Sequence, residues 1–512
     1  MLLPPAGHTA ELTAQELRGK NIYFEGVSGT GQAVSARVGR GTASIPASAV
    51  PCASCHGADG RGRPEGGIVP ADITWAHLTR PYGHRHQYGR EHPAFEETSL
   101  MRAITTGVDP AGNRLDMAMP RYAMAEQDLR DLIAYIQRLE ADLDPGITAT
   151  TLRLGTLLPR DGALAGLGRS MRRVLEAYFA DLNGEGGVHG RRIELVVGDY
   201  TTDRTAALWN ARDLLEQGDV FALISPFIVG MENDLGEFVR EKRIPVVGPY
   251  TFFAEHHADA SPYSFHLLAG LAQQAQLLMK YANQQLELDN PQTAVIYPEG
   301  ESYAGLLERL KNQATGLGWP APIHSAHKPG EWDMASAVRR LQAQAVELVF
   351  FLGPASALRE FTERAAAARW QPYILRPGVI GGQGIFDLAA DFTDRVFLAY
   401  PSLPVDHTAQ GVQEFESLHA RHGLDFAYSR AQISAFTAAQ VMAEALKRAG
   451  RALSREHLIT ALEGLNEYRP GLMPAISYTS TRRIGALGGY VVALDLPNRR
   501  FGPPSKWIPL EP

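Results

Sequence analysis

Cysteine is almost absent from this sequence, which holds two cysteines, Cys52 and Cys55, among 512 residues. A structural zinc site takes about four ligands, usually from two such pairs, so these residues alone do not form one. Long apolar runs are also missing, and without a run of about 18 residues no membrane-spanning helix is expected. The formal net charge of −7 is small for this length and excludes a general nucleic-acid binder.

Familiar catalytic signatures are missing as well. The sequence has no G-x-S-x-G elbow, no P-loop and no zinc-binding helix motif. Its glycine-rich stretch at residues 381–384 does not fit a dinucleotide-binding G-x-G-x-x-G after a strand. With 45% hydrophobic and 21% charged residues, the chain has the composition of a soluble globular protein of roughly two to four domains. These features favour a carrier or binding protein over an enzyme.

The two cysteines stand in a C-x-x-C-H motif at residues 52–56, which ends in His56. In this pattern each thiol can add to a haem vinyl group, and the adjacent imidazole becomes an axial ligand of the iron. A thioredoxin-like redox pair needs a βαβ context, which the Gly- and Pro-rich surroundings do not supply. The motif therefore predicts one covalently attached haem c, bound through Cys52, Cys55 and His56.

Helical patterns flank this motif. A capping box at residues 13–16 opens a short helix, and residues 57–62 are too rich in glycine for anything but a tight loop. Apolar residues at helical spacing then predict an amphipathic helix over residues 126–139. This order resembles the small soluble c-type cytochromes from about Glu11 to Glu140, and the resemblance implies an all-α cytochrome c domain over residues 1–143.

In that family a methionine late in the domain, often followed by proline, is the second axial ligand of the iron. Here Met119 directly precedes Pro120 and is our choice, with Met117 as the alternative. The resemblance also implies that the carbonyl of Pro70 accepts the free ring N–H of His56 and fixes its tautomer. Ligation by histidine and methionine leaves no open coordination site, which suits electron transfer.

Four histidines lie between the motif and the methionine: His77, His84, His86 and His92. Their spacing matches neither a helical i, i+4 pair nor a zinc-finger pattern. They could form a metal site or supply an alternative bis-histidine haem. The simpler interpretation is an exposed loop that packs near the haem edge.

Residues 144–150 form a linker, because Asp144-Pro145-Gly146 breaks the preceding helix. Beyond it, strands and helices alternate. The predicted strands are 152–158, 193–198, 220–225, 245–248, 293–297 and 347–352, and the predicted helices are 164–179, 205–217, 232–241, 303–316 and 355–368. This alternation predicts parallel sheets covered by helices on both faces, with ligands bound beyond the carboxyl ends of the strands.

Several stretches resemble type I periplasmic binding proteins, in particular the branched-chain amino acid receptors of ABC importers. The resemblance rests on Leu152–Pro159, Asn183–Arg191, Ala294–Tyr297 and Tyr303 with Ala304. It spans about residues 151–507 and implies a two-lobed α/β solute-binding domain over residues 151–512. The first lobe would hold about 151–268 and 401–475, and the second about 269–400 and 476–512. Such lobes close on a small molecule by hinge motion.

The resemblance places ligand contacts in loops of both lobes. They are Phe227, Tyr250, Thr251 and Phe252 in the first lobe, and Tyr303 and Gln383 in the second. The amino acid receptors hold a carboxylate with small hydroxyl residues and an ammonium with an acidic residue. This sequence has Pro226 and Phe227 at the first place and no acidic residue around Arg376 at the second. A less polar ligand, aromatic or of alcohol or acid type, is expected. Each aromatic residue could equally belong to a lobe core.

We therefore expect a periplasmic c-type haem electron-transfer protein joined to an ABC-transporter-type solute-binding module that captures or senses a small organic molecule. The alternative is a haem-coupled oxidoreductase acting on the molecule between the lobes, which would need a second redox cofactor. Expected partners are the small-molecule ligand, a periplasmic redox partner such as a dehydrogenase or oxidase, and an ABC importer, but no nucleic acid. A periplasmic location implies that a signal peptide was removed or that the gene start was placed too late.

Overall fold

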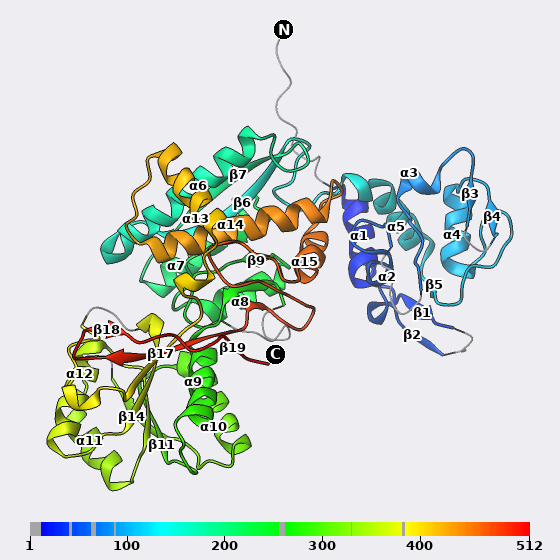
Figure 1. The fold of residues 1–512 in the computed structure, drawn as a ribbon. Helices are drawn as coiled ribbons and strands as arrows, with labels where there is room; N and C mark the ends of the chain where they lie inside the picture. The colour runs from blue at the N-terminus through cyan, green and yellow to red at the C-terminus, as the bar shows by residue number, and fades with distance from the viewer. Residues whose placement is uncertain are drawn as a thin grey trace. The chain divides into compact units, whose positions relative to one another are not determined.

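The computed structural model of the protein describes residues 12–39, 43–62, 68–86, 89–254, 262–328, 330–380 and 384–511. The chain forms two compact units (Figure 1). The first contains Met1–Thr150 with Ala449–His457, and the second contains Thr151–Arg448 with Leu458–Pro512. No helix of the described ranges is both long and apolar enough to cross a membrane.

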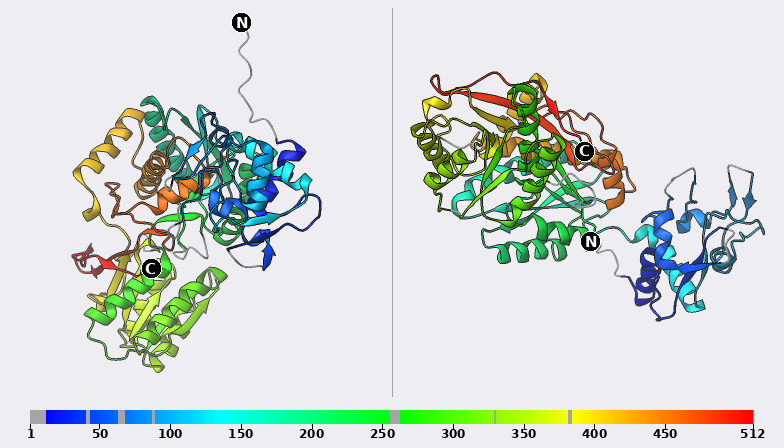
Figure 2. Two further views of the ribbon diagram at one scale, coloured as in Figure 1. Left: turned by 90° about the vertical axis from the view of Figure 1, so that its right-hand side faces the viewer. Right: turned by 90° about the horizontal axis from the view of Figure 1, so that it is seen from below.

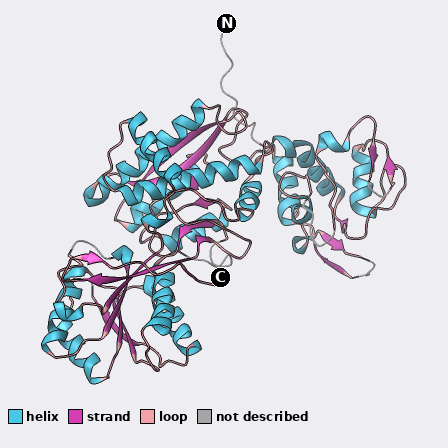
Figure 3. Ribbon diagram, viewed as in Figure 1, coloured by secondary structure: helices cyan, strands magenta, loops and turns pink. Residues whose placement is uncertain are grey.

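The first unit is mainly helical (Figure 3). Its helices are α1 (Ala14–Glu25), α2 (Cys52–His56), α3 (Trp75–Leu78), α4 (Glu97–Thr106) and α5 (Glu126–Arg138), with 3-10 turns η1 (Ala47–Ala49) and η2 (Leu139–Ala141). Two small antiparallel sheets accompany them. One has the order β2 (Ser44–Pro46), β1 (Ser35–Arg37), β5 (Arg121–Ala123), and the other pairs β3 (His84–Arg85) with β4 (Glu91–His92). The sequence predicted the helices at both ends but not these strands, which are too short to show alternation.

Helices α1 and α5 frame the first unit. The predicted capping box opens α1, since Thr13 accepts a hydrogen bond from the amide of Glu16 and Glu16 accepts one from the amide of Thr13. The helices meet at Gly19, where a Cβ atom would lie 2.0 Å from the carbonyl oxygen of Asp131. Beside this contact, Arg18 Nε lies 2.6 Å from the buried carboxylate of Asp131. The close approach lets apolar residues of both helices share one core with α4 and β5.

The second unit begins with a six-stranded parallel sheet in the order β16-β10-β9-β8-β6-β7. Its strands are β6 (Thr151–Pro159), β7 (Arg192–Tyr200), β8 (Ala222–Ile224), β9 (Val246–Val247), β10 (Ser264–Leu268) and β16 (Ile484–Ala486). Around it lie α6 (Ala165–Gly184), α7 (Arg204–Glu216), α8 (Glu232–Glu241), α13 (Ala409–His422) and α14 (Ser429–Ala449). Helix α15 (Arg455–Glu463) is divided between the units, and its residues from Leu458 onward belong to this one. This sheet with its helices is the first lobe.

The second lobe has an eight-stranded sheet in the order β12-β11-β13-β14-β15-β17-β18, with β19 paired to β17. The strands are β11 (Thr293–Pro298), β12 (Ile323–His327), β13 (Leu348–Phe351), β14 (Tyr373–Pro377), β15 (Val396–Tyr400), β17 (Gly488–Asp495), β18 (Arg500–Phe501) and β19 (Ile508–Pro509). Strands β11 to β15 are parallel as predicted, but β17 is antiparallel to β15, β18 and β19. The prediction of a parallel sheet is wrong here, because β17 enters the second sheet directly from β16 of the first lobe rather than through a crossover helix after β15, and β18 then returns through a short turn.

Helices cover both faces of the second sheet. Helices α9 (Leu271–Gln285) and α10 (Ala304–Gly316) bury one apolar face, whereas α11 (Met334–Ala343) and α12 (Ala355–Ala367) bury the other. Figure 1 and the further views in Figure 2 show this three-layer arrangement. The sheet is therefore covered on both faces, as its continuous apolar strands require.

The chain passes between the two lobes three times: after β10, after β15 and between β16 and β17. The last passage falls at Leu487, about ten residues beyond the lobe boundary expected near residue 476. Strand β16 explains the difference, because it returns to the first sheet beside β10 before β17 joins the second.

We expect Gly19→Ala to lower the free energy of unfolding of the first unit by about 1–3 kcal/mol, because the new methyl group meets the backbone of α5. Denaturant unfolding followed by haem absorbance measures this. Gly305→Ala in α10 is the matched control, since a Cβ atom there meets nothing within 4 Å. Equal unfolding midpoints for the two variants would contradict the close approach of α1 and α5.

Candidate functional site

The C-x-x-C-H residues form the short helix α2, which packs against α1. Cys52 and Cys55 lie one turn apart, so both thiols are on one face of this helix. Cys52 packs against the apolar core of the unit, and burial raises the pKa of its thiol to about 12. Cys55 is exposed, and the two cysteines are not joined by a disulfide.

One hydrogen bond sets the chemistry of His56. Its Nδ1 lies 2.9 Å from the carbonyl oxygen of Ala71. Because a carbonyl only accepts, Nδ1 carries the proton, and Nε2 keeps a lone pair for a metal. Burial lowers the pKa of His56, which favours the neutral, ligating form. The expectation that Pro70 supplies this carbonyl is wrong by one residue.

The glycine loop after the motif explains which carbonyl reaches His56. The amide of Gly62 donates to the carbonyl of His56 over 2.8 Å, and the amide of Ile73 donates to Gly60 over 2.7 Å. Gly62 has a φ of +84°, and a Cβ atom there would lie 2.3 Å from the carbonyl oxygen of Pro70. The Pro70 carbonyl therefore faces the glycine loop, which leaves that of Ala71 for the imidazole.

The methionine segment is held by Arg121. Its guanidinium donates to the carbonyl oxygens of Met119, Leu115 and Asp116 at 2.5, 2.9 and 3.0 Å. Met119 is half-buried, whereas the side chain of Met117 is 47% exposed. This difference supports Met119, although its role as a ligand stays a prediction.

Strand β5 brings this segment to the haem motif. Tyr122 in β5 is buried, and its hydroxyl donates to the carbonyl of Val50 over 2.5 Å, two residues before Cys52. Burial raises the pKa of Tyr122, and the neighbouring Cys52 and Cys55 raise it further. A pair of thiols, an imidazole with a free Nε2 and an adjacent methionine segment fit a covalently attached haem. Such a haem would accept and release one electron.

The four histidines form a column of rings beside Phe95. The ring centroids of His77 and His84 are 4.5 Å apart, those of His84 and His92 5.0 Å, and those of His92 and His86 5.1 Å. Nε2 of His86 lies 3.0 Å from Nε2 of His92 and also 3.0 Å from a guanidinium nitrogen of Arg90.

The positive guanidinium of Arg90 beside His86 disfavours a metal cation at the same place. The described residues also contain no group of three or more His, Cys, Asp or Glu side chains arranged for a metal ion. The expectation of an exposed loop is wrong, because His92 is buried and His77, His84 and His86 are half-buried in the stacked column.

In the second unit, the structure brings together two of the predicted ligand contacts. Phe227 follows β8 and Tyr250 follows β9, and their rings stack at 5.6 Å with an interplanar angle of 17°. Phe227 is only 4% exposed, and its other side meets the ring of Tyr200 at 4.6 Å. Phe227 therefore lies in the lobe core beneath Tyr250, which is the more accessible ring.

The remaining contacts are divided between the first and the second lobe. Thr251 donates to Glu232 over 2.7 Å, and Phe252 and Phe253 pack against the apolar core of the second lobe. There the ring of Phe253 meets Tyr303 at 5.5 Å, nearly perpendicular to it. The predicted contact Gln383 lies outside the described residues.

Three further residues lie near these loops: Arg376, which was noted from the sequence only for lacking an acidic neighbour, and Tyr400 and Arg430, which were not predicted. Arg376 is fully buried at the end of β14, Tyr400 ends β15, and Arg430 lies in the first turn of α14. The sequence held a signal for Tyr400, because this residue ends an apolar strand and ligands bind beyond the carboxyl ends of such strands. It held no signal for Arg430, which is far along the chain from the stretches that resemble the binding-protein family.

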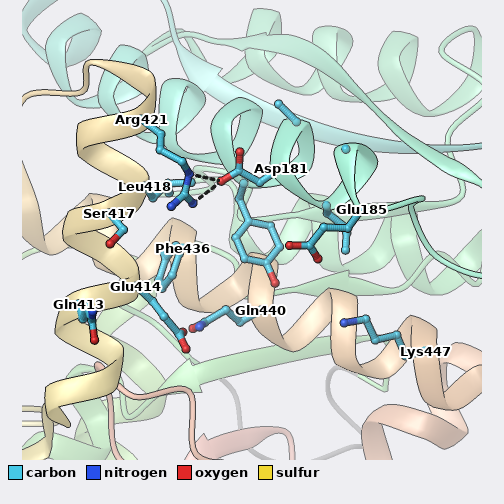
Figure 4. Close-up of a pocket in the computed structure, with 14 residues that line it drawn as sticks. Asp181, Glu185, Gln413, Glu414, Ser417, Leu418, Arg421, Phe436, Gln440 and Lys447 are labelled. Atoms are coloured by element: carbon cyan, nitrogen blue, oxygen red, sulfur yellow. Dashed lines mark hydrogen bonds and ion pairs between the residues drawn. The ribbon is translucent and has the colours of Figure 1, made fainter.

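A groove of about 680 Å³ lies elsewhere, between α6, α13 and α14 (Figure 4). Arg421 and His422 pair with Asp181 at 2.5 and 2.7 Å beside it. Its lining includes the last turns of α6, which lead into the beginning of β7. It therefore lies away from the carboxyl ends of the strands, and none of the predicted site residues lines it.

Comparison with family models gives two matches. The family described as periplasmic binding protein matches residues 151–495, and that described as cytochrome c matches residues 47–140. Among curated proteins, the Leu/Ile/Val-binding protein BraC3 of Rhizobium johnstonii is 20% identical over 339 residues, which is 64% of this chain and 88% of that protein. An amino acid binding protein of Pseudomonas aeruginosa is 24% identical over 221 residues, or 42% of this chain and 59% of that protein.

Solved structures share the fold of the second unit. A branched-chain amino acid ABC transporter protein from Thermus thermophilus, with bound valine, aligns with a TM-score of 0.57 at 18% identity, covering 71% of this chain and 98% of that one. A fatty acid ABC transporter substrate-binding protein from Thermomonospora curvata aligns with a TM-score of 0.55 at 20% identity, covering 72% and 95%. At these identities the likeness concerns the fold.

We expect Met119→Ala to remove the sulfur-to-iron absorption band of the oxidised haem and to lower its reduction potential, because methionine ligation raises that potential. Met117→Ala is the matched control and should change neither quantity. Optical spectra and a potentiometric titration of the full chain measure both. Loss of the band in Met117→Ala instead would assign the ligand to Met117.

The histidine column predicts a pH-dependent stability. Burial, followed by the nearby Arg90, lowers the pKa of His86 to about 4, and burial lowers the pKa of His84. The unfolded chain, whose histidines titrate near about 6.5, therefore binds more protons than the folded unit. The free energy of unfolding should fall as the pH falls from about 6.5 towards the lowered pKa values.

Replacing His86→Gln should flatten this dependence, as measured by denaturant midpoints of the haem unit at a series of pH values. His324→Gln in the second unit should leave the slope for the haem unit unchanged. An unaltered slope in His86→Gln would show that His86 does not contribute.

Proposed function

Since the chain belongs to the periplasmic binding protein family over residues 151–495 and carries a cytochrome c domain over residues 47–140, we propose that it is a periplasmic electron-transfer protein whose second unit captures or senses a small organic molecule. The observation that carries this proposal is that one chain contains both a haem-attachment motif and a two-lobed binding fold. His56, held by Ala71, is prepared as an iron ligand, and Phe227, Tyr250 and Tyr303 follow strands of a two-lobed binding fold.

The first unit is suited to passing electrons rather than to binding substrate. With His56 and Met119 as the axial ligands, no coordination position of the iron would be open to a small molecule. A redox partner such as a periplasmic dehydrogenase or oxidase would then exchange electrons with the haem edge. The histidine column and the Arg121 clamp keep the surrounding segments in place.

The second unit is suited to holding a molecule between the carboxyl ends of two sheets. Its relatives include Leu/Ile/Val-binding proteins and a fatty acid ABC transporter substrate-binding protein, which suggests delivery of a captured molecule to an ABC importer as one use of the unit. Capture would draw the lobes together across the three chain passages.

The test uses the full chain produced with covalent haem attachment. Mass spectrometry should find one haem, and a thermal-shift screen with valine, phenylalanine, benzyl alcohol, phenylacetate and hexanoate should find a stabilising ligand. Extraction should release no flavin or quinone. A second redox cofactor would favour the haem-coupled oxidoreductase instead, and no shift with any compound would contradict ligand capture for these classes.

We expect Tyr250→Leu and Tyr303→Leu to weaken binding of the stabilising compound by about tenfold, because each removes an aromatic contact while keeping apolar volume. Trp209→Leu is the matched control, since Trp209 is 66% exposed on α7. Isothermal titration measures the affinities, and the haem spectrum should be the same in all three variants. Unchanged affinity in both loop variants would exclude these rings from the ligand site.

A further inference from the structure

An arginine without an acidic partner reaches both lobes of the second unit. Arg430 is exposed in the first turn of α14, and its guanidinium carbon lies 5.9 Å from the ring centroid of Tyr400 in the second sheet. Within the ranges that the structure describes, no carboxylate forms an ion pair with Arg430. Its charge is therefore available to another group.

Two tyrosine hydroxyls lie near this charge. Burial raises the pKa of Tyr250 and of Tyr400, and the positive charge of Arg430 opposes the shift in both cases. Arg430 is thus close to Tyr250 beyond β9 of the first sheet and to Tyr400 at the end of β15 of the second. Among the described residues, neither hydroxyl has a hydrogen-bond partner.

A second arginine adds positive charge behind Tyr400. The buried guanidinium of Arg376 donates to the carbonyl of Gly353 over 2.7 Å and to the carbonyl of Ile380, while its Nε has no partner among the described atoms. These acceptors are neutral, so they do not cancel its charge. Burial lowers the pKa of Arg376 to about 10, which leaves it charged at neutral pH.

The described acidic residues nearby accept hydrogen bonds but form no ion pair with either arginine. Glu232 accepts from the hydroxyl of Thr251 at 2.7 Å and from the amide of Gly230 at 2.9 Å. Asp406 accepts from the hydroxyls of Tyr490 and Ser402. Among the described residues, Arg376 and Arg430 are therefore two cations that no carboxylate pairs with.

Further aromatic rings lie beside Tyr250 and in the loop that follows it. Tyr250 stacks on Phe227, and the neighbouring loop leads to Phe253 and Tyr303. Rings of this kind suit an apolar or aromatic ligand body. A fully hydrated ion such as inorganic phosphate would gain little from them.

We propose that the molecule captured by the second unit is a small carboxylic acid with an apolar or aromatic body, and that Arg430 is the residue that selects its carboxylate. This inference rests on the proposed capture function. The guanidinium of Arg430 pairs with the carboxylate, Tyr250 and Tyr400 donate hydrogen bonds to it, and the aromatic rings hold the body. An amino acid is disfavoured, because its ammonium would face Arg430 and the buried Arg376.

The test compares acids with their amides on the full haem-carrying chain. Isothermal titration is performed at pH 7 with phenylacetate, phenylacetamide, hexanoate, hexanamide and inorganic phosphate. The variants are Arg430→Gln, Arg430→Lys and, as a matched control, Arg359→Gln, an exposed arginine on α12 that pairs with Glu363. The haem spectrum of each variant reports that the first unit is intact.

We expect at least one acid to bind about tenfold or more tightly than its amide, and phosphate to bind more weakly than that acid. Arg430→Gln should lose about tenfold or more in affinity for that acid and leave the amide unchanged, because a hydrogen bond to a charged group is lost. Arg430→Lys should keep part of the affinity, and Arg359→Gln should keep all of it.

Equal binding of an acid and its amide, or an unchanged acid affinity in Arg430→Gln, would overturn the inference while leaving capture of a molecule in place. Binding of an amide with no binding of either acid would do the same. If none of these compounds binds although the haem spectrum is intact, both the inference and the capture function fail for these classes.

Discussion

Parallel strands place the loops that follow them on one edge of a sheet, and the binding unit depends on this constraint. Tyr250 and Tyr400 follow strands of different sheets, yet both lie near Arg430, because the two lobes present their carboxyl edges to each other. The chain passes between the lobes three times, so the two edges are joined by several segments. Continuous apolar strands and helices on both faces keep the sheets rigid, which leaves specificity to a few side chains at the edges.

The haem unit depends on a much smaller interaction. A single hydrogen bond from Nδ1 of His56 to Ala71 directs Nε2 outward as a ligand. That bond requires the glycine loop to turn tightly enough to bring residue 71 back to the motif. Positive φ at Gly62 and the absence of its Cβ make this possible. Local conformational freedom thus determines the protonation of the residue that would bind iron.

Joining the two units gives one chain an electron carrier and a binding protein, and their electrostatics differ. The first unit buries neutral imidazoles: burial lowers the pKa of His56 and of His86. The second keeps Arg376 charged in a nearly dry setting, held by neutral carbonyls. A buried cation without an acidic partner is costly, and such groups are concentrated at functional sites. The contrast is consistent with a protein that moves electrons at one site and recognises an acid at another.

Local spacing was enough to predict the cofactor motif, both families and the helices and strands of the first alternating stretch: Cys52 to His56, the Thr13 capping box and the alternation after residue 150 carry these signals. Long helices such as α9, α13 and α14 were not predicted. Three features became known from the fold alone: the carbonyl of Ala71 reaches His56, β17 runs antiparallel to β15, and Phe227 lies in the core rather than on the ligand surface. The fold also placed Arg430 beside Tyr400. These contacts join residues distant along the chain, and periodicity within a short window carries no information about them.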